Sequence, residues 1–340
     1  MTRTLLSAFI LLSVLLTFSC SKSNNDTPTP TPPVDTTAPV KPDTLITGWT
    51  KIKISTEPLY DVFFSNNTIG YSICPVGFLY KTIDGGISWV IKKDSLSDIA
   101  NMSVTNNGNI HCINTNGYVY TSVNGGSNFS RTRLNTVGNS FDVFFPDDNN
   151  GFTVSGGALF QTTDGGINWS GIFQTTGLSL SPTGFYSLFF LNDTTGWICG
   201  EGKIFKSNGN LHSWTQSIFP SSTALASLLN VFATSTATVF ASSYYSVFES
   251  ANEGLNFSIL STLPYIPGPQ TSPIPDLHFI DASTGYMCLG TRIFKTINGG
   301  ISWTPVVSLG GSPIIIEIHF TDANHGWGCT SDGYILRYSM

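Results

Sequence analysis

Charged residues are scarce in this sequence. Asp, Glu, Lys and Arg make up 11% of the 340 residues, with a formal net charge of −6, whereas globular proteins ordinarily carry about 25% charged residues. Arginine is rarer still, and after the first twenty residues it occurs only at Arg131, Arg133, Arg292 and Arg337. Without a basic cluster to contact phosphates, we expect no nucleic-acid partner, and the negative charge disfavours docking on anionic lipid headgroups.

The sequence also lacks the patterns of a metal centre or a nucleophilic active site. Its histidines have neither metal-ligand spacing nor a partner in a recognisable catalytic motif: His111, His212, His278, His319 and His325. The segment 147–151 looks like a calcium loop, but it aligns with the turns at 192–196 and 281–285 and is better interpreted as an ordinary turn. We therefore expect no metal and no cofactor.

The first twenty residues have the pattern of an export signal. Arg3 precedes an apolar run from Leu5 to Leu16 that is too short to span a membrane. The run ends at Thr17-Phe18-Ser19-Cys20, which resembles the lipobox of bacterial lipoproteins, although Thr17 stands where an aliphatic residue is usual. The resemblance implies a signal peptide over residues 1–19 and lipidation of Cys20. The alternative is an ordinary secretory signal with an incidental cysteine.

Residues 20–45 read as a tether. This segment is rich in Ser, Thr, Asn and Asp and contains Thr-Pro repeats. Proline at this density favours extended conformations and prevents a packed core, and about 25 such residues reach roughly 80 Å when extended. We expect a disordered tether that holds the following domain clear of an outer membrane, in the periplasm or at the cell surface, with the lipid as the only membrane contact.

A ten-residue phrase recurs along the rest of the chain. It reads Phe/Tyr-Lys-Thr-x-Asp/Asn-Gly-Gly-x-Ser/Asn-Trp at 80–89, 160–169 and 294–303, with degenerate copies at 120–129, 205–214 and 248–257. The turn positions at 84, 124, 164, 208, 252 and 298 are spaced by 40, 40, 44, 44 and 46 residues. A period of this size indicates one small antiparallel sheet that is repeated, with each copy packed on its neighbours.

Each repeat contains four short strand signals. The first ends in Phe in most repeats, a Gly-aromatic pair precedes the second, the recurring phrase holds the third, and the fourth begins at the Trp. The complete units are 58–93, 98–133, 139–174, 184–219, 225–260 and 274–307. A seventh unit, 314–340, has three strand signals, and 48–52 resembles its missing fourth strand. Residues 46–340 therefore predict an all-β, seven-bladed β-propeller whose N-terminal strand completes the last blade and closes the ring.

The blade pattern resembles two known groups. Ser/Thr-x-Asp-x-Gly-x-x-Trp is similar to the Asp-box of BNR repeats, and the whole blade is similar to the photosystem II assembly and stability factors of the Ycf48/HCF136-like type. The resemblance covers residues 46–340 and implies the fold more strongly than a function, because propellers host many activities. It also suggests help in assembling membrane complexes. Those relatives bear an arginine patch that this sequence lacks, so a photosynthetic role does not follow.

Asp84, Asp164 and Asn298 sit in the expected hairpin between the third and fourth strands. A short carboxylate or amide there can accept hydrogen bonds from its own turn, and glycine permits positive φ. The indole rings that follow can pack over the same turns, and they belong to Trp89, Trp169 and Trp303. We interpret these residues as structural rather than catalytic or metal-binding.

Five cysteines lie on the expected second strands of five repeats: Cys74, Cys112, Cys199, Cys288 and Cys329. Their number is odd and equivalent positions on adjacent blades are too far apart for disulfides. A thiolate ring that binds a soft metal is the alternative, but buried small apolar residues are the better interpretation. His278 and His319 share a place on consecutive first strands, which indicates packing or lining near the axis.

The enzymatic alternative is a glycoside hydrolase of the sialidase-like or endo-glucanase-like type, because Asp-box propellers include such enzymes. A sialidase needs three arginines around the substrate carboxylate, yet Arg131 and Arg133 are expected on an outer strand. Hydrolysis also needs two facing carboxylates in a pocket, and acidic residues outside the turns are few. We therefore expect no enzyme activity.

A monomeric binding scaffold for an envelope protein or a glycan is the better hypothesis. In propellers the ligand face is usually formed by the loops between the second and third strands and between blades. The candidates in these loops are Tyr244, Tyr245, Tyr265, Glu201, Arg292 and Asp332. Tyrosines on proline-rich backbone make a plausible contact patch, and the alternative is that the loops only shield the blade edges.

Overall fold

The computed structural model describes residues 44–45, 47–93, 95–136, 139–174, 184–220, 228–243, 246–263, 276–311 and 313–340. These residues form strands and turns, without a helix in the described ranges. Nothing in this part of the chain is a helix of membrane-spanning length and apolarity. Cys20 and most of the expected tether lie outside the described residues, as do Tyr244, Tyr245 and Tyr265.

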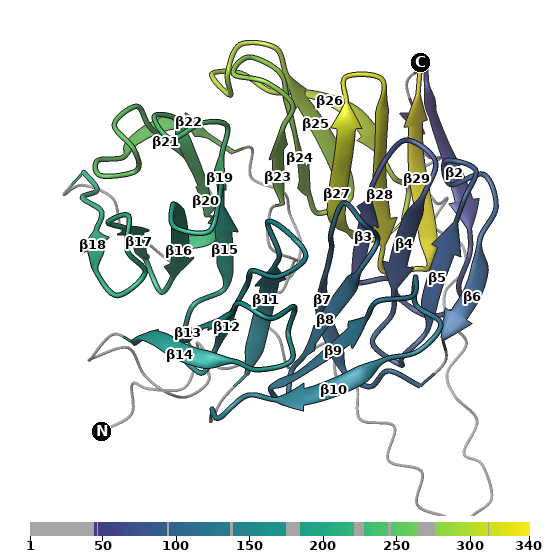
Figure 1. Cartoon of the computed structure of the whole chain (residues 1–340). Helices are drawn as coiled ribbons and strands as arrows, with labels where there is room; N and C mark the ends of the chain where they lie inside the picture. The colour runs from purple at the N-terminus through teal and green to yellow at the C-terminus, as the bar shows by residue number, and fades with distance from the viewer. Residues whose placement is uncertain are drawn as a thin grey trace, which may run out of the picture.

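The strands form seven separate antiparallel sheets, which follow one another along the chain (Figure 1). Blade 1 contains β3 (Asp61–Phe64), β4 (Gly70–Ile73), β5 (Leu79–Thr82) and β6 (Val90–Lys93). Blade 2 contains β7 (Ile99–Val104), β8 (Ile110–Asn114), β9 (Tyr118–Ser122) and β10 (Ser130–Arg133). Blade 3 contains β11 (Ser140–Phe144), β12 (Gly151–Ser155), β13 (Ala158–Thr162) and β14 (Ser170–Gln174).

The next three sheets repeat this order. Blade 4 contains β15 (Ser187–Phe190), β16 (Gly196–Gly200), β17 (Lys203–Ser207) and β18 (Trp214–Gln216). Blade 5 contains β19 (Leu228–Ala233), β20 (Val239–Ser243), β21 (Ser246–Ser250) and β22 (Ser258–Thr262). Blade 6 contains β23 (Leu277–Phe279), β24 (Gly285–Leu289), β25 (Arg292–Thr296) and β26 (Thr304–Ser308), with β1 (Thr44–Leu45) as a fifth strand.

Blade 7 joins the two ends of the described chain. It contains β27 (Ile315–Asp322), β28 (His325–Thr330) and β29 (Tyr334–Ser339), and its outer strand is β2 (Trp49–Lys53). Trp49 pairs with Tyr338, so the purple strand lies beside the yellow one in Figure 1. Strand β27 in turn contacts β3 of blade 1. The predicted seven-bladed fold, with the N-terminal strand completing the last blade, is confirmed.

Strand β1 was not expected from the sequence. Thr44 pairs with Ser308 and Leu45 pairs with Val307, antiparallel to the outer strand of blade 6. Both residues fall at the end of the segment expected to be a tether. The ordered sheet pairing therefore starts two residues before the expected domain boundary.

Burial changes from the inner to the outer strands of each blade. The second strands β4, β8, β12, β16, β20 and β24 are buried along their whole length, because neighbouring blades cover both faces. The outer strand β6 is mostly exposed. The five cysteines are buried and free on or next to the second strands. Burial raises the pKa of the Cys112 and Cys199 thiols, so both stay protonated.

Aromatic stacking joins the blades. In five blades an aromatic residue near the start of the second strand stacks on an aromatic residue of the next blade. That partner lies at the end of the first strand, and the ring centroids are 3.4 to 4.0 Å apart. The pairs are Trp327–Phe64, His111–Phe145, Phe152–Phe190, Phe240–Phe279 and Tyr286–Phe320. Stacked rings of this size bury large apolar areas, so these pairs form the core between blades.

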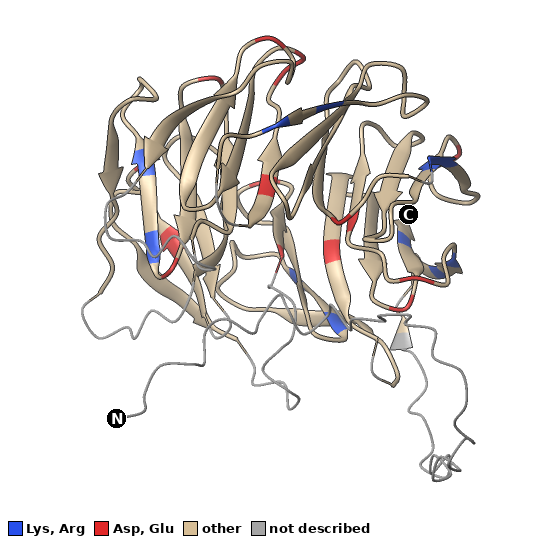
Figure 2. Cartoon of the chain, turned by 90° about the horizontal axis from the view of Figure 1, so that it is seen from below, with Lys and Arg blue, Asp and Glu red and all other residues tan. Residues whose placement is uncertain are grey.

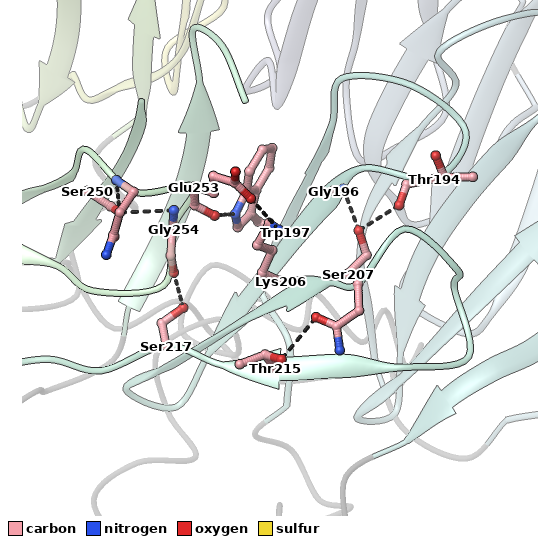
Figure 3. Close-up of polar contacts among 12 residues, drawn as sticks. Thr194, Gly196, Trp197, Lys206, Ser207, Thr215, Ser217, Ser250, Glu253 and Gly254 are labelled. Atoms are coloured by element: carbon pink, nitrogen blue, oxygen red, sulfur yellow. Dashed lines mark hydrogen bonds and ion pairs between the residues drawn. The ribbon is translucent and has the colours of Figure 1, made fainter. Parts of the chain in front are cut away.

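Polar contacts add to the junction of blades 4 and 5 (Figure 3). The Trp197 indole donates a hydrogen bond to the Glu253 carbonyl at 2.9 Å, and the Lys206 ammonium forms an ion pair with the Glu253 carboxylate at 2.8 Å. The Ser217 hydroxyl donates to the Gly254 carbonyl. Blade 4 therefore holds the turn of blade 5 through its second strand, its third strand and the residue that follows its fourth strand.

Candidate functional site: the central channel

A cavity of about 460 Å³ lies along the axis of the propeller. All seven blades line it with residues on or near their first strands. The lining also includes Pro75, Thr115 and Ser331, which belong to turns between second and third strands. We call the face that carries these turns and the connections between blades the mouth face, because the cavity reaches it. A cavity of this volume is within the usual range for ligand pockets.

One position on the first strand, or directly before it in blade 6, is polar in every blade and faces the cavity. These seven residues, here named the polar ring, are Asp61, Asn101, Asp142, Ser187, Asn230, Asp276 and Glu317. In β7, β11, β19 and β27 a β-bulge directly precedes the ring residue. A bulge re-aims the side chain that follows it, which accounts for a polar side chain on a strand that is otherwise packed between blades.

The polar ring connects each blade to the next through the backbone. In four blades the ring side chain accepts a hydrogen bond from a backbone N–H of the following blade. The donor and acceptor pairs are Met102 N to Asp61 (2.7 Å), Val143 N to Asn101 (3.3 Å), Leu188 N to Asp142 (2.9 Å) and Ile318 N to Asp276 (3.0 Å). These hydrogen bonds satisfy buried backbone N–H groups that would otherwise lack a partner, so the ring stabilises the circular arrangement of the blades.

Burial makes the ring carboxyl groups weak acids. Desolvation raises the pKa of Asp61 to about 8, that of Asp142 to about 7 and that of Asp276 to about 6. The pKa of Glu317 is raised well above its ordinary value, by desolvation first and then by the other three carboxyl groups. Backbone N–H donors lower each aspartate pKa but do not offset the burial.

Asp276 and Glu317 form a carboxyl pair. Their side chains are hydrogen-bonded to each other. Two carboxylates without a proton cannot donate to one another, so at least one of the pair is protonated in this arrangement. Asn230 also donates to Asp276 at 3.0 Å, whereas the buried Oδ1 of Asn230 has no hydrogen-bond partner.

A second ring lies two residues further along each first strand. This aromatic girdle consists of Phe63, Phe144, Phe189, Phe232, His278 and His319, and blade 2 has Ser103 at the same position. Neighbouring rings from Phe144 round to Phe63 have centroids 4.4 to 5.6 Å apart. The girdle therefore surrounds the channel except at blade 2, where the small serine leaves a gap.

The two girdle histidines are neutral. Desolvation lowers the pKa of His278 to about 4 and that of His319 to about 3. A neutral imidazole can still donate one hydrogen bond, and the Nε2 atom of His319 lies 3.0 Å from the Phe64 carbonyl oxygen. Both histidines line the cavity, as the sequence indicated.

The Gly-Gly turns lie on the opposite face. Asp84 Oδ1 accepts hydrogen bonds from the Thr82 hydroxyl (2.7 Å) and the Ser88 N–H (3.0 Å), and the Trp89 indole donates to the Gly86 carbonyl. Asp164 and Trp169 repeat this geometry. Asn298 accepts the same two kinds of bond, but the Trp303 indole donates instead to Ser261 of blade 5. In the structure these Asp and Asn side chains form hydrogen bonds within their own turns, and the Trp303 indole forms one between blades.

The described residues that the sequence proposed for ligand binding lie at the mouth face but outside the cavity lining. Glu201 and Asp332 occupy the turns between the second and third strands of blades 4 and 7, and Arg292 is the first residue of the third strand of blade 6. Asp332 accepts a hydrogen bond from the Thr330 hydroxyl at 2.6 Å, so its carboxylate is engaged in its own turn. Among the described residues, no cluster of three or more His, Cys, Asp or Glu side chains is arranged to hold a metal ion.

The polar ring is the feature that sequence reasoning missed. A signal for it exists, because four blades share an acidic residue followed by an aliphatic residue and two aromatic rings. These segments are 61–64, 142–145, 276–279 and 317–320. Aligning the blades on the last aromatic ring brings the acidic positions into register.

Seven antiparallel sheets, six with four strands and one with five, arranged around an axial channel define a seven-bladed β-propeller, and comparisons with solved structures agree. The chain is similar to YCF48 from Cyanidioschyzon merolae, with 18% identity, a TM-score of 0.68, and coverage of 86% of this chain and 99% of that one. It is similar to a structure described as YCF48 bound to D1 peptide, with 17% identity, a TM-score of 0.68, and coverage of 90% and 100%.

The WD40 β-propeller domain of Doa1 is similar at 11% identity, with a TM-score of 0.66 and coverage of 87% of this chain and 98% of that one. No protein-family model matches the chain, and no curated protein matches it in sequence. At these identities the likeness establishes the fold alone.

Proposed function

We propose that this chain is a lipid-anchored, non-catalytic propeller of the bacterial cell envelope that binds a segment of a partner protein through its central channel. The observation that carries the proposal is the cavity of about 460 Å³, which all seven blades line and which reaches the turns of the mouth face. Concave sites with aromatic walls and a few placed polar groups are typical of ligand binding. A glycan segment is the second candidate for the same cavity.

The similar structure described as YCF48 bound to D1 peptide supports a protein segment as the ligand. That complex belongs to another protein, and its peptide is not carried over to this chain. The distribution of charged residues favours a ligand other than that peptide. The lysines and arginines are spread over separate strands and turns (Figure 2), whereas carboxyl groups line the cavity.

The arrangement of carboxyl groups disfavours a glycoside hydrolase. Such enzymes hold two carboxyl groups about 5 to 9.5 Å apart, with the sugar or a water between them. Asp276 and Glu317 are instead hydrogen-bonded to each other. Asp61 and Asp142 are each bound to a backbone N–H of the next blade. The ring carboxyl groups therefore act in holding the blades and in shaping the cavity.

Photocrosslinking in living cells tests the binding proposal. Benzoylphenylalanine replaces Thr115, which lines the cavity at the mouth face, in the full chain at its natural expression level. The matched control carries it at Ile167, which is 68% exposed on the opposite face. We expect a discrete protein adduct from position 115 that is absent from position 167. Adducts from position 167 alone, or the same adducts from both, would contradict a site at the channel.

The anchor is tested separately. A Cys20→Ala variant of the full chain should lose incorporation of labelled palmitate and move from the membrane fraction to the soluble envelope fraction. A Ser21→Ala variant serves as the matched control and should behave as wild type. Membrane association that survives Cys20→Ala would contradict the lipid anchor without affecting the binding proposal.

A further inference from the structure

The cavity carries acidic groups without a positively charged partner among its described lining residues. Five of its lining residues are acidic, namely Asp61, Asp98, Asp142, Asp276 and Glu317. Among the described residues that line it, none is lysine or arginine. On the outer surface, by contrast, the Glu253 carboxylate is paired with Lys206 at 2.8 Å. Buried carboxyl groups are ordinarily paired with a cation or kept neutral, so the cavity is suited to receive a cation.

Two further features of the lining are suited to an ammonium group. The buried Oδ1 of Asn230, a member of the polar ring, has no hydrogen-bond partner and requires a donor. The aromatic girdle contacts the same cavity, with Phe189 and Phe232 rings 4.8 Å apart. Aromatic faces attract organic cations, and the attraction increases when water is excluded. Carboxyl groups, a free acceptor and aromatic rings together form the surroundings that an alkylammonium group requires.

We propose that the central cavity binds an alkylammonium group, supplied by a lysine side chain of the partner segment. This inference rests on the proposed function and specifies its ligand. The ammonium group would lie among the carboxyl groups of the polar ring, near Glu317 and Asp142. The aromatic girdle would lie beyond the ammonium group, and the butyl stem would extend from the polar ring towards the mouth face.

An inorganic divalent cation fits the cavity less well. Such ions need several oxygen ligands converging at about 2 to 2.6 Å. The described residues contain no cluster of three or more ligands arranged for a metal. Each ring aspartate is also held by a backbone N–H of a different blade, which keeps the carboxyl groups from converging on one point.

Binding is coupled to proton release. The groups that face Glu317 are Asp61, Asp142, Asp276, His278, His319, Cys288 and Cys329. The two histidines are neutral and the thiols are protonated, so the charge at the site is set by the carboxyl groups. An arriving ammonium favours ionised carboxylates and displaces the proton held by the Asp276–Glu317 pair. Affinity should therefore increase as the pH rises from 6 to about 8.

The test uses the mature full chain and three probes: n-pentylammonium, 1-pentanol and magnesium chloride. Calorimetry in two buffers of different ionisation enthalpy measures affinity and proton release together. We expect n-pentylammonium to bind with release of about one proton. We expect 1-pentanol to bind about tenfold more weakly, because it lacks the charge. Tight magnesium binding without pentylammonium binding would overturn the proposal.

Variants locate the site. Asp142→Asn and Glu317→Gln preserve side-chain volume, and each should weaken n-pentylammonium binding by about tenfold. Glu249→Gln on β21, which does not line the cavity, should bind as wild type. Equal affinity in all four proteins would overturn the proposal. Thermal unfolding of each variant confirms that a loss of binding is not a loss of fold.

The two proposals fail in different ways. Loss of the crosslink at position 115 would contradict the protein-binding function, whatever the calorimetry shows. A crosslink at position 115 together with equal binding of n-pentylammonium and 1-pentanol would retain the function and overturn the lysine ligand. A crosslinked partner segment whose lysines can be replaced by norleucine without loss of affinity would also overturn it.

Discussion

The aromatic ring of Phe320 packs against Gly326, in the space that a side chain at that position would fill. The two residues pair across β27 and β28, and a Cβ built on Gly326 would lie 2.1 Å from the Phe320 ring. The same relationship holds in four other blades, where the glycine Cβ would come within 2.3 to 2.7 Å of the ring. In blades 2 and 5 the aromatic residue is replaced by Val104 or Ala233, and the partner is no longer glycine. The Gly-aromatic pair of each repeat is therefore a packing requirement.

Gly326→Ala should destabilise the propeller by about 1 to 3 kcal/mol, because the methyl group overpacks against a ring that also stacks on Tyr286. Adding Phe320→Val removes the clash, so a double-mutant cycle should show a coupling of about 1 kcal/mol or more. Urea unfolding of the four proteins measures it. Gly171→Ala is the control, since a Cβ there would be 3.6 Å from the nearest ring. Additive effects would contradict the steric account.

Closure of the ring depends on Trp49. This residue is 5% exposed and packs against Phe320 and Tyr338, with ring centroids 6.2 and 5.2 Å away. Trp49→Ala should cost about 3 to 5 kcal/mol in the free energy of unfolding. Thr50→Ala, at an exposed position on the same strand, should change it by less than about 0.5 kcal/mol. Equal effects of the two substitutions would mean that β2 is dispensable for closure.

The stability of the propeller should fall as the pH rises from about 6.5 to 8. The folded pKa values of Asp61 and Asp142, about 8 and 7, lie above the ordinary value of 3.8. Protonation of these two carboxyl groups in the folded protein contributes to its stability. This contribution is complete below the pKa of the groups in the unfolded chain and is lost as the pH rises through their pKa in the folded protein. Below about pH 6.5 the buried histidines oppose this trend, because the unfolded chain protonates them and the folded chain does not.

The difference between wild type and Asp142→Asn isolates one ring carboxyl group. The asparagine can still accept the hydrogen bond from the Leu188 N–H, but it does not titrate. Chemical unfolding between pH 5 and 8.5 should show a steeper loss of stability in wild type than in the variant. Parallel pH profiles would contradict the raised pKa of Asp142.

Asp84 should matter for its oxygen atoms rather than for its charge. Asp84→Asn copies Asn298, which accepts equivalent hydrogen bonds, and should cost less than about 1 kcal/mol, whereas Asp84→Ala should cost about 2 kcal/mol. Hydrogen bonds from Ser88 lower the Asp84 pKa to about 2. The charge-dependent part is therefore present above pH 4 and is lost as the pH falls towards 2. A large effect of Asp84→Asn at pH 7 would contradict this account.

The number of blades and their closure were predictable because local signals encode them. Gly-containing turns mark the third-to-fourth hairpins of blades 1 to 6, and the segment that begins at Trp49 resembles the one that begins at Trp303, directly before β26. Turn chemistry depends on adjacent residues, so it can be recognised in one sequence. Strand β1 could not be predicted in this way, because two residues that pair with a neighbouring strand have no periodicity.

The polar ring could not be assembled from the sequence, because its members come together only when the propeller closes. Asp61 and Glu317 are 256 residues apart in the chain, yet they interact across the junction of blades 1 and 7. An acidic residue on a half-alternating strand normally predicts a solvent-facing side chain. The bulge before Glu317 adds a register shift that the hydrophobic pattern does not reveal.

The central claim is that the partner segment enters the channel, and a substitution in the aromatic girdle tests it most directly. Ser103→Phe places an aromatic ring at the girdle position where other blades have one and fills the gap at blade 2. Ser103→Ala is the matched control, since both variants lose the hydrogen bond from the Phe145 N–H to the Ser103 hydroxyl.

The measurement is the yield of the position-115 crosslink in wild type and in these two variants, with thermal unfolding to confirm the fold of each. The account predicts that Ser103→Ala retains the adduct and that Ser103→Phe loses it, because only the phenylalanine narrows the channel. An undiminished adduct in folded Ser103→Phe would show that the partner binds outside the channel and would contradict the account.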